Sequence, residues 1–234
     1  EVSLERPVTV AANASVITAD HLAALSTPLD APTTISQETH NAYRILKDDV
    51  SMRDGTQNAG WMLVQNGDGG VLAGVRDAWQ QYPKALVADP KTSRLMIKLW
   101  PQSAGELNLE TGAEAYGPGA VARGSAFGLG KTHELTFGFF DRAFEPGPAR
   151  EMVAPWREPW LLSAHPAWLQ ATDAWGAIGP IRRDGSLDEA EGVLDEMFEW
   201  AQRQPRNFAW YGMLDYGDTR LWYRKEAYDK SYDT

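Results

Sequence analysis

His133 stands in a short polar segment whose residue types suit acid–base chemistry. The segment Lys131-Thr-His-Glu134 joins a cation, an imidazole and a carboxylate within four positions. In an extended strand alternate side chains share a face, so we expect Lys131 and His133 to point one way and Glu134 the other. An imidazole titrates near neutral pH and can act as base or acid. We therefore place His133, Lys131 and the upstream Arg123 among the catalytic candidates. A structural His–Glu or Lys–Glu network is the alternative.

A second polar motif lies between residues 210 and 220, where glycines, tyrosines, aspartates and an arginine alternate. This composition suits a loop that carries polar groups to a cleft. Tyr211 is a catalytic candidate for proton transfer, and a pair of carboxylates also permits glycosidase chemistry. The alternative is a turn between helices in which an aspartate caps a helix. The substrate-binding candidates of this motif are Trp210, Asp215, Tyr216, Asp218 and Arg220.

A third group interleaves aromatic and basic residues between positions 76 and 84. An arginine fork fits a carboxylate, and aromatic rings can line a groove for a glycan. The same residues could instead pack the junction between a strand and a loop. This group adds Arg76, Trp79, Tyr82 and Lys84 to the binding candidates, whereas His40 and His165 stand alone and are interpreted as structural.

The elements that must hold these groups are mainly β-strands in the first part of the chain. Residues 60–65 and 71–76 are apolar runs around an Asn/Gly/Asp turn, which predicts a hairpin. Residues 93–100 and 130–140 predict further strands. Several strands separated by turn signals favour an antiparallel β-sandwich over residues 1–145, followed by a smaller helical segment over 150–234. In that segment Ser186 should cap a helix over 187–204, its apolar stripe should serve packing, and Pro205 should end it.

Composition narrows the class of protein. The formal net charge of −10 and the pI near 4.9 argue against a nucleic-acid partner. No apolar run is long enough to span a bilayer, so no membrane partner is expected. The chain has no cysteine, and its sparse histidines predict no metal site and no cofactor. Ten tryptophans are many for 234 residues; they indicate either sugar stacking or a core rich in large rings.

Three segments together resemble the exo-rhamnogalacturonan lyase family and its relatives. They are residues 75–84 followed by 95–101, residues 128–137, and residues 208–218. Members of this family have a small barrel, a central β-sandwich and an α/α toroid. The resemblance implies that residues 1–145 correspond to the sandwich and residues 150–234 to the start of the toroid. We therefore expect the remaining domains of a larger chain as partners.

The resemblance also implies a secreted or periplasmic polysaccharide lyase whose partner is an acidic polysaccharide or oligosaccharide. Such an enzyme cleaves a uronate-containing, rhamnogalacturonan-like glycan by β-elimination, which needs a base, an acid and a group that neutralises the carboxylate. A noncatalytic carbohydrate-binding sandwich and a fragment of a glycoside hydrolase remain the alternatives.

Overall fold

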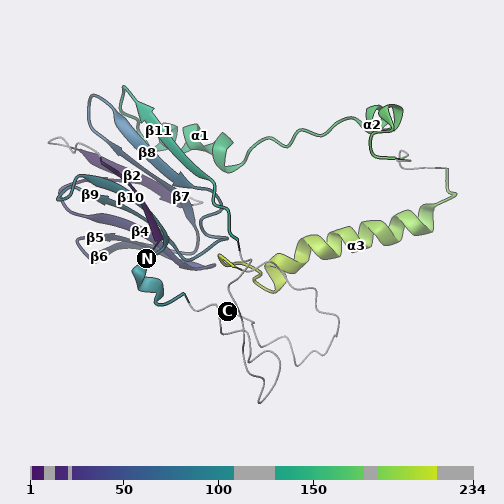
Figure 1. Ribbon diagram of the computed structural model, residues 1–234, viewed down its shortest axis with the longest axis horizontal. Coiled ribbons are helices and arrows are strands. Elements are labelled where there is room, and N and C mark those ends of the chain that lie inside the picture. The colour runs from purple at the N-terminus through teal and green to yellow at the C-terminus, as the bar shows by residue number, and fades with distance from the viewer. Residues whose placement is uncertain (1, 8–13, 21–22, 108–129, 177–183, 215–234) are drawn as a thin grey trace, which may run out of the picture. The chain divides into compact units, whose positions relative to one another are not determined.

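The chain divides into two compact units, Glu1–Arg157 with Tyr211–Thr234, and Glu158–Trp210. The computed structural model describes residues 2–7, 14–20, 23–107, 130–176 and 184–214 (Figure 1).

Two antiparallel sheets form the first unit (Figure 1). Among the described residues, one sheet has the strand order β1 (Val2–Pro7), β10 (Arg94–Trp100), β9 (Lys84–Asp89), β4 (Thr33–Thr39), β5 (Ala42–Lys47) and β6 (Val50–Gly55). The other has the order β11 (Leu135–Phe140), β8 (Gly70–Val75), β7 (Asn58–Gln65), β2 (Ser15–Asp20) and β3 (Ala24–Pro28). The predicted fold class is confirmed: the protein is mainly β, an antiparallel sandwich followed by a smaller helical segment.

Strand β7 is buried on both faces, and its period of two divides the side chains between two cores. Met62 and Val64 belong to the core between the sheets. Trp61 and Leu63 belong to a second core on the opposite face. Because successive side chains of a strand point to opposite faces, a strand covered on both sides becomes a continuous apolar run. This is the reason that residues 59–64 carry no polar side chain.

Helix α1 (Pro146–Arg157) covers the outer face of the second sheet (Figure 1). Its buried residues Ala149 and Val153 pack in the second core. The ring of Trp156 lies over β8 so closely that a Cβ at Gly74 would sit 2.7 Å from it. A glycine is therefore required there by the approach of the helix to the strand.

Hydrogen bonds and an ion pair between polar side chains connect the two sheets. The Tyr43 hydroxyl on β5 donates to the Asp20 carboxylate on β2 over 2.8 Å, and Arg53 on β6 pairs with the same carboxylate at 2.8 Å. Gln37 on β4 accepts from the Asn58 side chain on β7 over 2.8 Å. These buried or half-buried side chains thus have partners, as burial demands.

The local predictions for the strands hold with one difference in length. The predicted hairpin is formed by β7 and β8, and Asn66 makes its turn by accepting the backbone N–H groups of Asp68 and Gly69. Strand β10 occupies the predicted position. The strand predicted over 130–140 begins only at Leu135, because its partner β8 ends at Val75 and one further backbone bond, from Arg76 N to Glu134 O, closes the pairing. A short 3-10 helix, Gln102–Ala104, follows β10.

The second unit contains helices α2 (Pro166–Thr172) and α3 (Asp188–Asn207). The prediction that Ser186 caps α3 is wrong, since Leu187 is the N-cap and the Ser186 hydroxyl donates to Asp184 instead. Pro205 does not end the helix, which continues to Asn207. Near the end of a helix a proline removes only one internal hydrogen bond, so the last turn persists.

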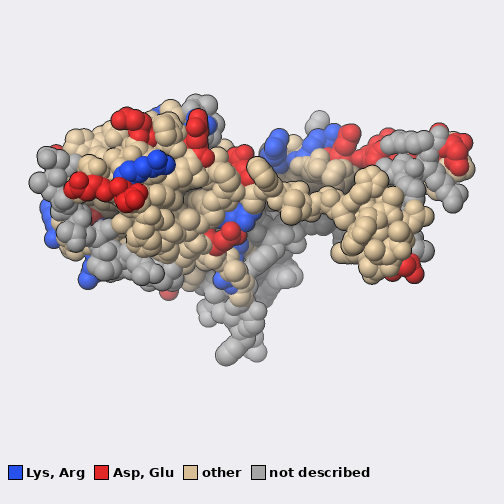
Figure 2. All heavy atoms as spheres, turned by 90° about the horizontal axis from the view of Figure 1, so that it is seen from above, with Lys and Arg blue, Asp and Glu red and all other residues tan. Residues whose placement is uncertain are grey.

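The apolar stripe of α3 was expected to be packed, but in the second unit it is open. Its large apolar residues are all more than half exposed: Val193, Leu194, Met197 and Phe198. Acidic residues occupy the first turn and Arg206 the last, which complements the helix dipole. Figure 2 shows acidic and basic side chains interspersed on the face of the sandwich that it draws.

Within the described ranges, no helix combines the length and the hydrophobicity needed to cross a lipid bilayer.

Candidate functional site

The loop between β8 and β9, residues 76–83, forms the base of the candidate site. It carries the half-buried rings of Trp79 and Tyr82. A backbone bond of 2.8 Å from Gln81 N to Asp77 O closes the loop into a compact turn. Gly60 of β7 lies under it with φ of 75°, and a Cβ there would lie 2.5 Å from the carbonyl oxygen of Val75. The loop therefore sits directly on the sheet backbone.

Lys84 is the first residue of β9 and is buried, with 2% of its surface exposed. Its ammonium group donates to the backbone carbonyls of Gln81 at 2.5 Å and of Pro83 at 3.1 Å. Burial, followed by the nearby charge of Lys131, lowers the pKa of Lys84 to about 7. The side chain thus fastens the loop from within while carrying a charge that titrates close to neutral pH.

His133 and Lys131 precede β11 and are half-buried, whereas Thr132 and Glu134 are exposed. The predicted alternation of the four residues is therefore present although they lie outside the strand. Burial, followed by the charges of Lys84 and Lys131, lowers the pKa of His133 to about 4. Glu134 points away to an ion pair of 2.7 Å with Arg76.

Tyr211 reaches the loop from far along the chain. The residues after it bind the loop backbone: Gly212 N donates to Gln80 O and Met213 N to Tyr82 O, both over 2.7 Å. This anchoring brings the Tyr211 ring to 4.9 Å from the Trp79 ring, centroid to centroid.

His40 completes the aromatic group from the turn between β4 and β5. Its ring stacks on Tyr211 at 6.0 Å with an interplanar angle of 25°, and it lies 6.3 Å from Tyr82. The sequence interpretation of His40 as an isolated structural residue missed this contact. The sequence could indicate the two-residue turn between β4 and β5, because a turn is a local feature. It could not indicate the ring that His40 faces, because that ring belongs to residue 211.

The site combines basic groups and aromatic rings with unsatisfied polar atoms. Among the described residues, buried side-chain atoms without a hydrogen-bond partner include Gln80 Oε1 and Gln81 Oε1 of the loop and His133 Nδ1. Such atoms are few in folded proteins and call for an explanation such as a catalytic role or a bound water. The charges that affect Lys84 and His133 are cationic. The cations of this arrangement could pair with an anionic group of a ligand, and its rings could stack on a flat apolar face.

Of the other predicted site residues, the structure describes only Arg76 and Trp210. Arg76 is the first residue of the loop and forms an ion pair with Glu134. Trp210 belongs to the second unit, where its ring stacks on Phe208 at 5.9 Å. The remaining candidates lie outside the described residues: Arg123, Asp215, Tyr216, Asp218 and Arg220.

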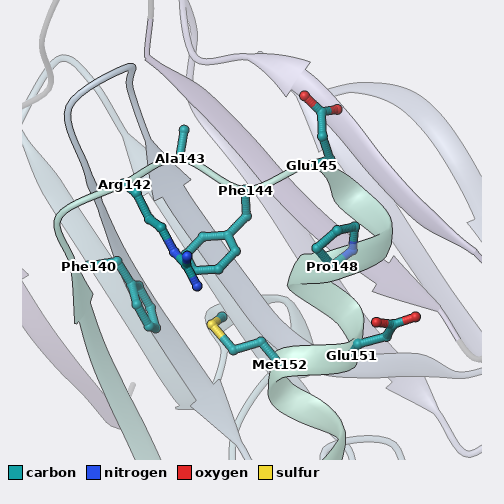
Figure 3. A pocket seen from close by; sticks show the side chains of 8 residues that line it. All are labelled: Phe140, Arg142, Ala143, Phe144, Glu145, Pro148, Glu151 and Met152. Carbon is teal, nitrogen blue, oxygen red and sulfur yellow. The ribbon is translucent and has the colours of Figure 1, made fainter.

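A separate hollow of about 690 Å³ lies at the start of α1, and none of the predicted site residues line it (Figure 3). The Arg142 guanidinium lies over the ring of Phe144, 5.0 Å from its centroid, and Phe140 meets the same ring edge-on at 5.1 Å. Phe144 is held at its backbone by both ends of the Gln65 amide. Glu145 and Glu151 point away from the rings (Figure 3). Because Arg142 already covers the face of the Phe144 ring, we interpret this hollow as a feature of side-chain packing.

Comparison with known proteins adds one similarity. The chain is 27% identical over 194 residues to the uncharacterized protein YetA of Bacillus subtilis (strain 168), covering 79% of this chain and 23% of that protein. The chain thus spans about a quarter of the length of this relative. No family model matches the sequence.

Proposed function

We propose that this chain is part of a polysaccharide lyase that cleaves a uronate-containing, rhamnogalacturonan-like glycan by β-elimination, with its substrate bound at the loop of residues 76–83. The observation that carries this proposal is the presence of two groups at one loop: Tyr211 packs on Trp79 of the loop, and Lys131 and His133 lie near Lys84, the residue that directly follows it. Such a substrate would be met outside the cytoplasm, in a secreted or periplasmic setting.

The basic groups support an anionic ligand. Lys84 and Lys131 are near enough to His133 to lower its pKa, and Glu134 is withdrawn to Arg76. Two cations held close together repel one another, and a ligand carboxylate placed between them would relieve that repulsion. The overall charge of −10 means that this attraction is local, because the body of the protein repels anions.

The rings support a sugar as the carrier of that carboxylate. Trp79 and Tyr211 are each half-buried, so each leaves part of a flat ring available while the rest is fixed. Aromatic residues with one apolar body and one polar tip suit ligands that are themselves apolar on one face and hydroxylated at the edges.

The reaction needs few groups. A base removes the proton from the carbon next to the carboxylate, the electrons of that bond form the new carbon–carbon double bond, and the bond to the glycosidic oxygen breaks. That oxygen receives a proton from an acid. Lys131 would oppose the carboxylate charge as it delocalises, and Tyr211 and His133 are the groups positioned near the loop for the remaining roles.

The experiment is the ultraviolet absorbance of unsaturated uronate, followed on a panel of acidic polysaccharides. The variants His133→Ala, Tyr211→Phe and Lys131→Gln should each lose most of the signal. Matched controls are His165→Ala, on the second unit, and Lys91→Gln, an exposed lysine paired with Asp48; both should keep it.

Two other outcomes would overturn the lyase proposal. Reducing sugar released without unsaturated uronate would indicate a glycoside hydrolase. Glycan affinity that depends on Trp79 with no product from the same glycan would indicate a noncatalytic binding module.

A further inference from the structure

We propose that His133 meets its ligand as a neutral imidazole that donates a hydrogen bond through Nε2, and that buried Lys84 is the positioning residue that keeps the imidazole in this form. The inference rests on the proposed function for the identity of the ligand, a uronate carboxylate, but its geometry is independent of that identity.

The first observation is the burial of one ring nitrogen. His133 Nδ1 is inaccessible and has no hydrogen-bond partner among the described residues. A protonated imidazole carries N–H groups at both nitrogens, and a buried N–H without an acceptor is costly. A buried lone pair without a donor is tolerated more often. The proton of the neutral ring therefore belongs on Nε2, which is left as the donor toward a ligand.

The second observation is the place of Lys84. Its ammonium cannot turn away from the site, because it is held by the carbonyls of Gln81 and Pro83 at the start of a buried strand. A fixed positive charge disfavours a second one on a neighbouring ring. Lys84 therefore acts on His133 from behind the loop and need not touch the ligand.

The groups around His133 come from several elements. Lys84 starts β9, Lys131 lies two residues before His133, and both oppose its protonation. The adjacent Glu134 would favour protonation, but it is exposed and paired with Arg76. The balance of these charges keeps the imidazole neutral.

A role follows for each residue of the proposed reaction. A neutral imidazole that already carries its proton on Nε2 is a donor and does not accept the proton from carbon. His133 would then hydrogen-bond the carboxylate as negative charge develops on it, a task suited to a fixed donor in a partly dry site. Proton transfer would fall to Tyr211, whose ring is fixed against Trp79.

The test is a nuclear magnetic resonance titration of the whole chain with ¹⁵N-labelled histidine and no glycan present. Loss of one set of signals in His133→Gln assigns the residue among the four histidines. We expect Nδ1 to show the shift of an unprotonated ring nitrogen and Nε2 that of a protonated one at neutral pH. The pKa should lie near 4 and should rise toward the ordinary 6.5 in Lys84→Gln and in Lys131→Gln. Burial remains in both variants, so the rise should be partial. Lys91→Gln should leave the pKa unchanged.

A proton on Nδ1, a wild-type pKa near 6.5, or a pKa that neither lysine variant moves would overturn the inference. Lys131→Gln serves if Lys84→Gln does not fold, because Lys131 is half-exposed. The titration needs no substrate, so its failure would leave the lyase proposal standing, and a failed lyase assay would leave the titration valid.

Discussion

The centroids of the Trp79 and Tyr211 rings lie 4.9 Å apart at an angle of 57°, although one ring follows β8 and the other follows α3. The pair is secured by backbone bonds from Gly212 and Met213 to the loop that carries Trp79. A tilted aromatic pair of this kind adds a modest stabilisation beyond the burial of its area. A substitution of either ring should therefore affect the same site.

Replacing Trp79 by alanine should weaken binding of a uronate oligosaccharide about tenfold, or ~1.4 kcal/mol, because one ring face is removed and the other loses its neighbour. The measurement is isothermal titration calorimetry. Trp168→Ala on α2, where the ring is mostly exposed, is the matched control and should bind as the unmodified chain does. Equal affinity of the two variants would place the glycan elsewhere.

The buried charge of Lys84 predicts a particular dependence of stability on pH. Its pKa is lowered from 10.5 to about 7, so between these values the unfolded chain binds more protons than the folded chain. The free energy of unfolding should therefore rise with pH above about 7, by at most roughly 1.4 kcal/mol per pH unit.

Urea unfolding from about pH 7 to about pH 9 measures this rise. Lys84→Met should flatten the curve over that range, and Lys91→Met, an exposed control, should not. The range stops below the titration of Tyr43, whose pKa is raised to about 12 by burial and by Asp20 and which therefore opposes the rise above about pH 10. A flat curve in the unmodified chain would contradict the burial of a charged Lys84.

The Tyr43 hydroxyl should contribute to stability through its bond to Asp20. Tyr43→Phe leaves a buried carboxylate with one hydrogen bond fewer, so the free energy of unfolding should fall by about 1–3 kcal/mol. Tyr211→Phe, which removes a hydroxyl from a half-buried ring, should change it by about 0.5 kcal/mol or less. Chemical denaturation of both variants is the comparison, and equal stabilities would mean that Arg53 and the backbone N–H of Ala23 satisfy Asp20 without the hydroxyl.

The approach of α1 to the second sheet can be tested at Gly74. A methyl group there would lie 2.7 Å from the Trp156 ring, so Gly74→Ala should destabilise the chain by about 1–3 kcal/mol. Gly67→Ala in the β7–β8 turn has open space around it and is the matched control. Thermal unfolding distinguishes them; if Gly74→Ala is as stable as Gly67→Ala, α1 does not pack on this strand.

Local sequence patterns were sufficient to predict much of the sandwich. The β7–β8 hairpin follows from two apolar runs around Asn66, since a turn and the strands that flank it are neighbours in sequence. The alternation of Lys131 and His133 with Thr132 and Glu134 is local in the same way. Helix α1 was not predicted because prolines and a tryptophan obscure its period, and it becomes stable by covering Trp61.

The sequence by itself therefore determined the β-rich class, the main hairpin and the residue types with chemistry to offer, because these depend on contacts between near neighbours. Only the tertiary structure decided that His40 and Tyr211 meet at the Trp79 loop, that Lys84 is buried behind it, and that the stripe of α3 is exposed within its unit. Burial and long-range contacts are properties of the folded chain, and they set the pKa values of Lys84 and His133 that no spacing of residues encodes.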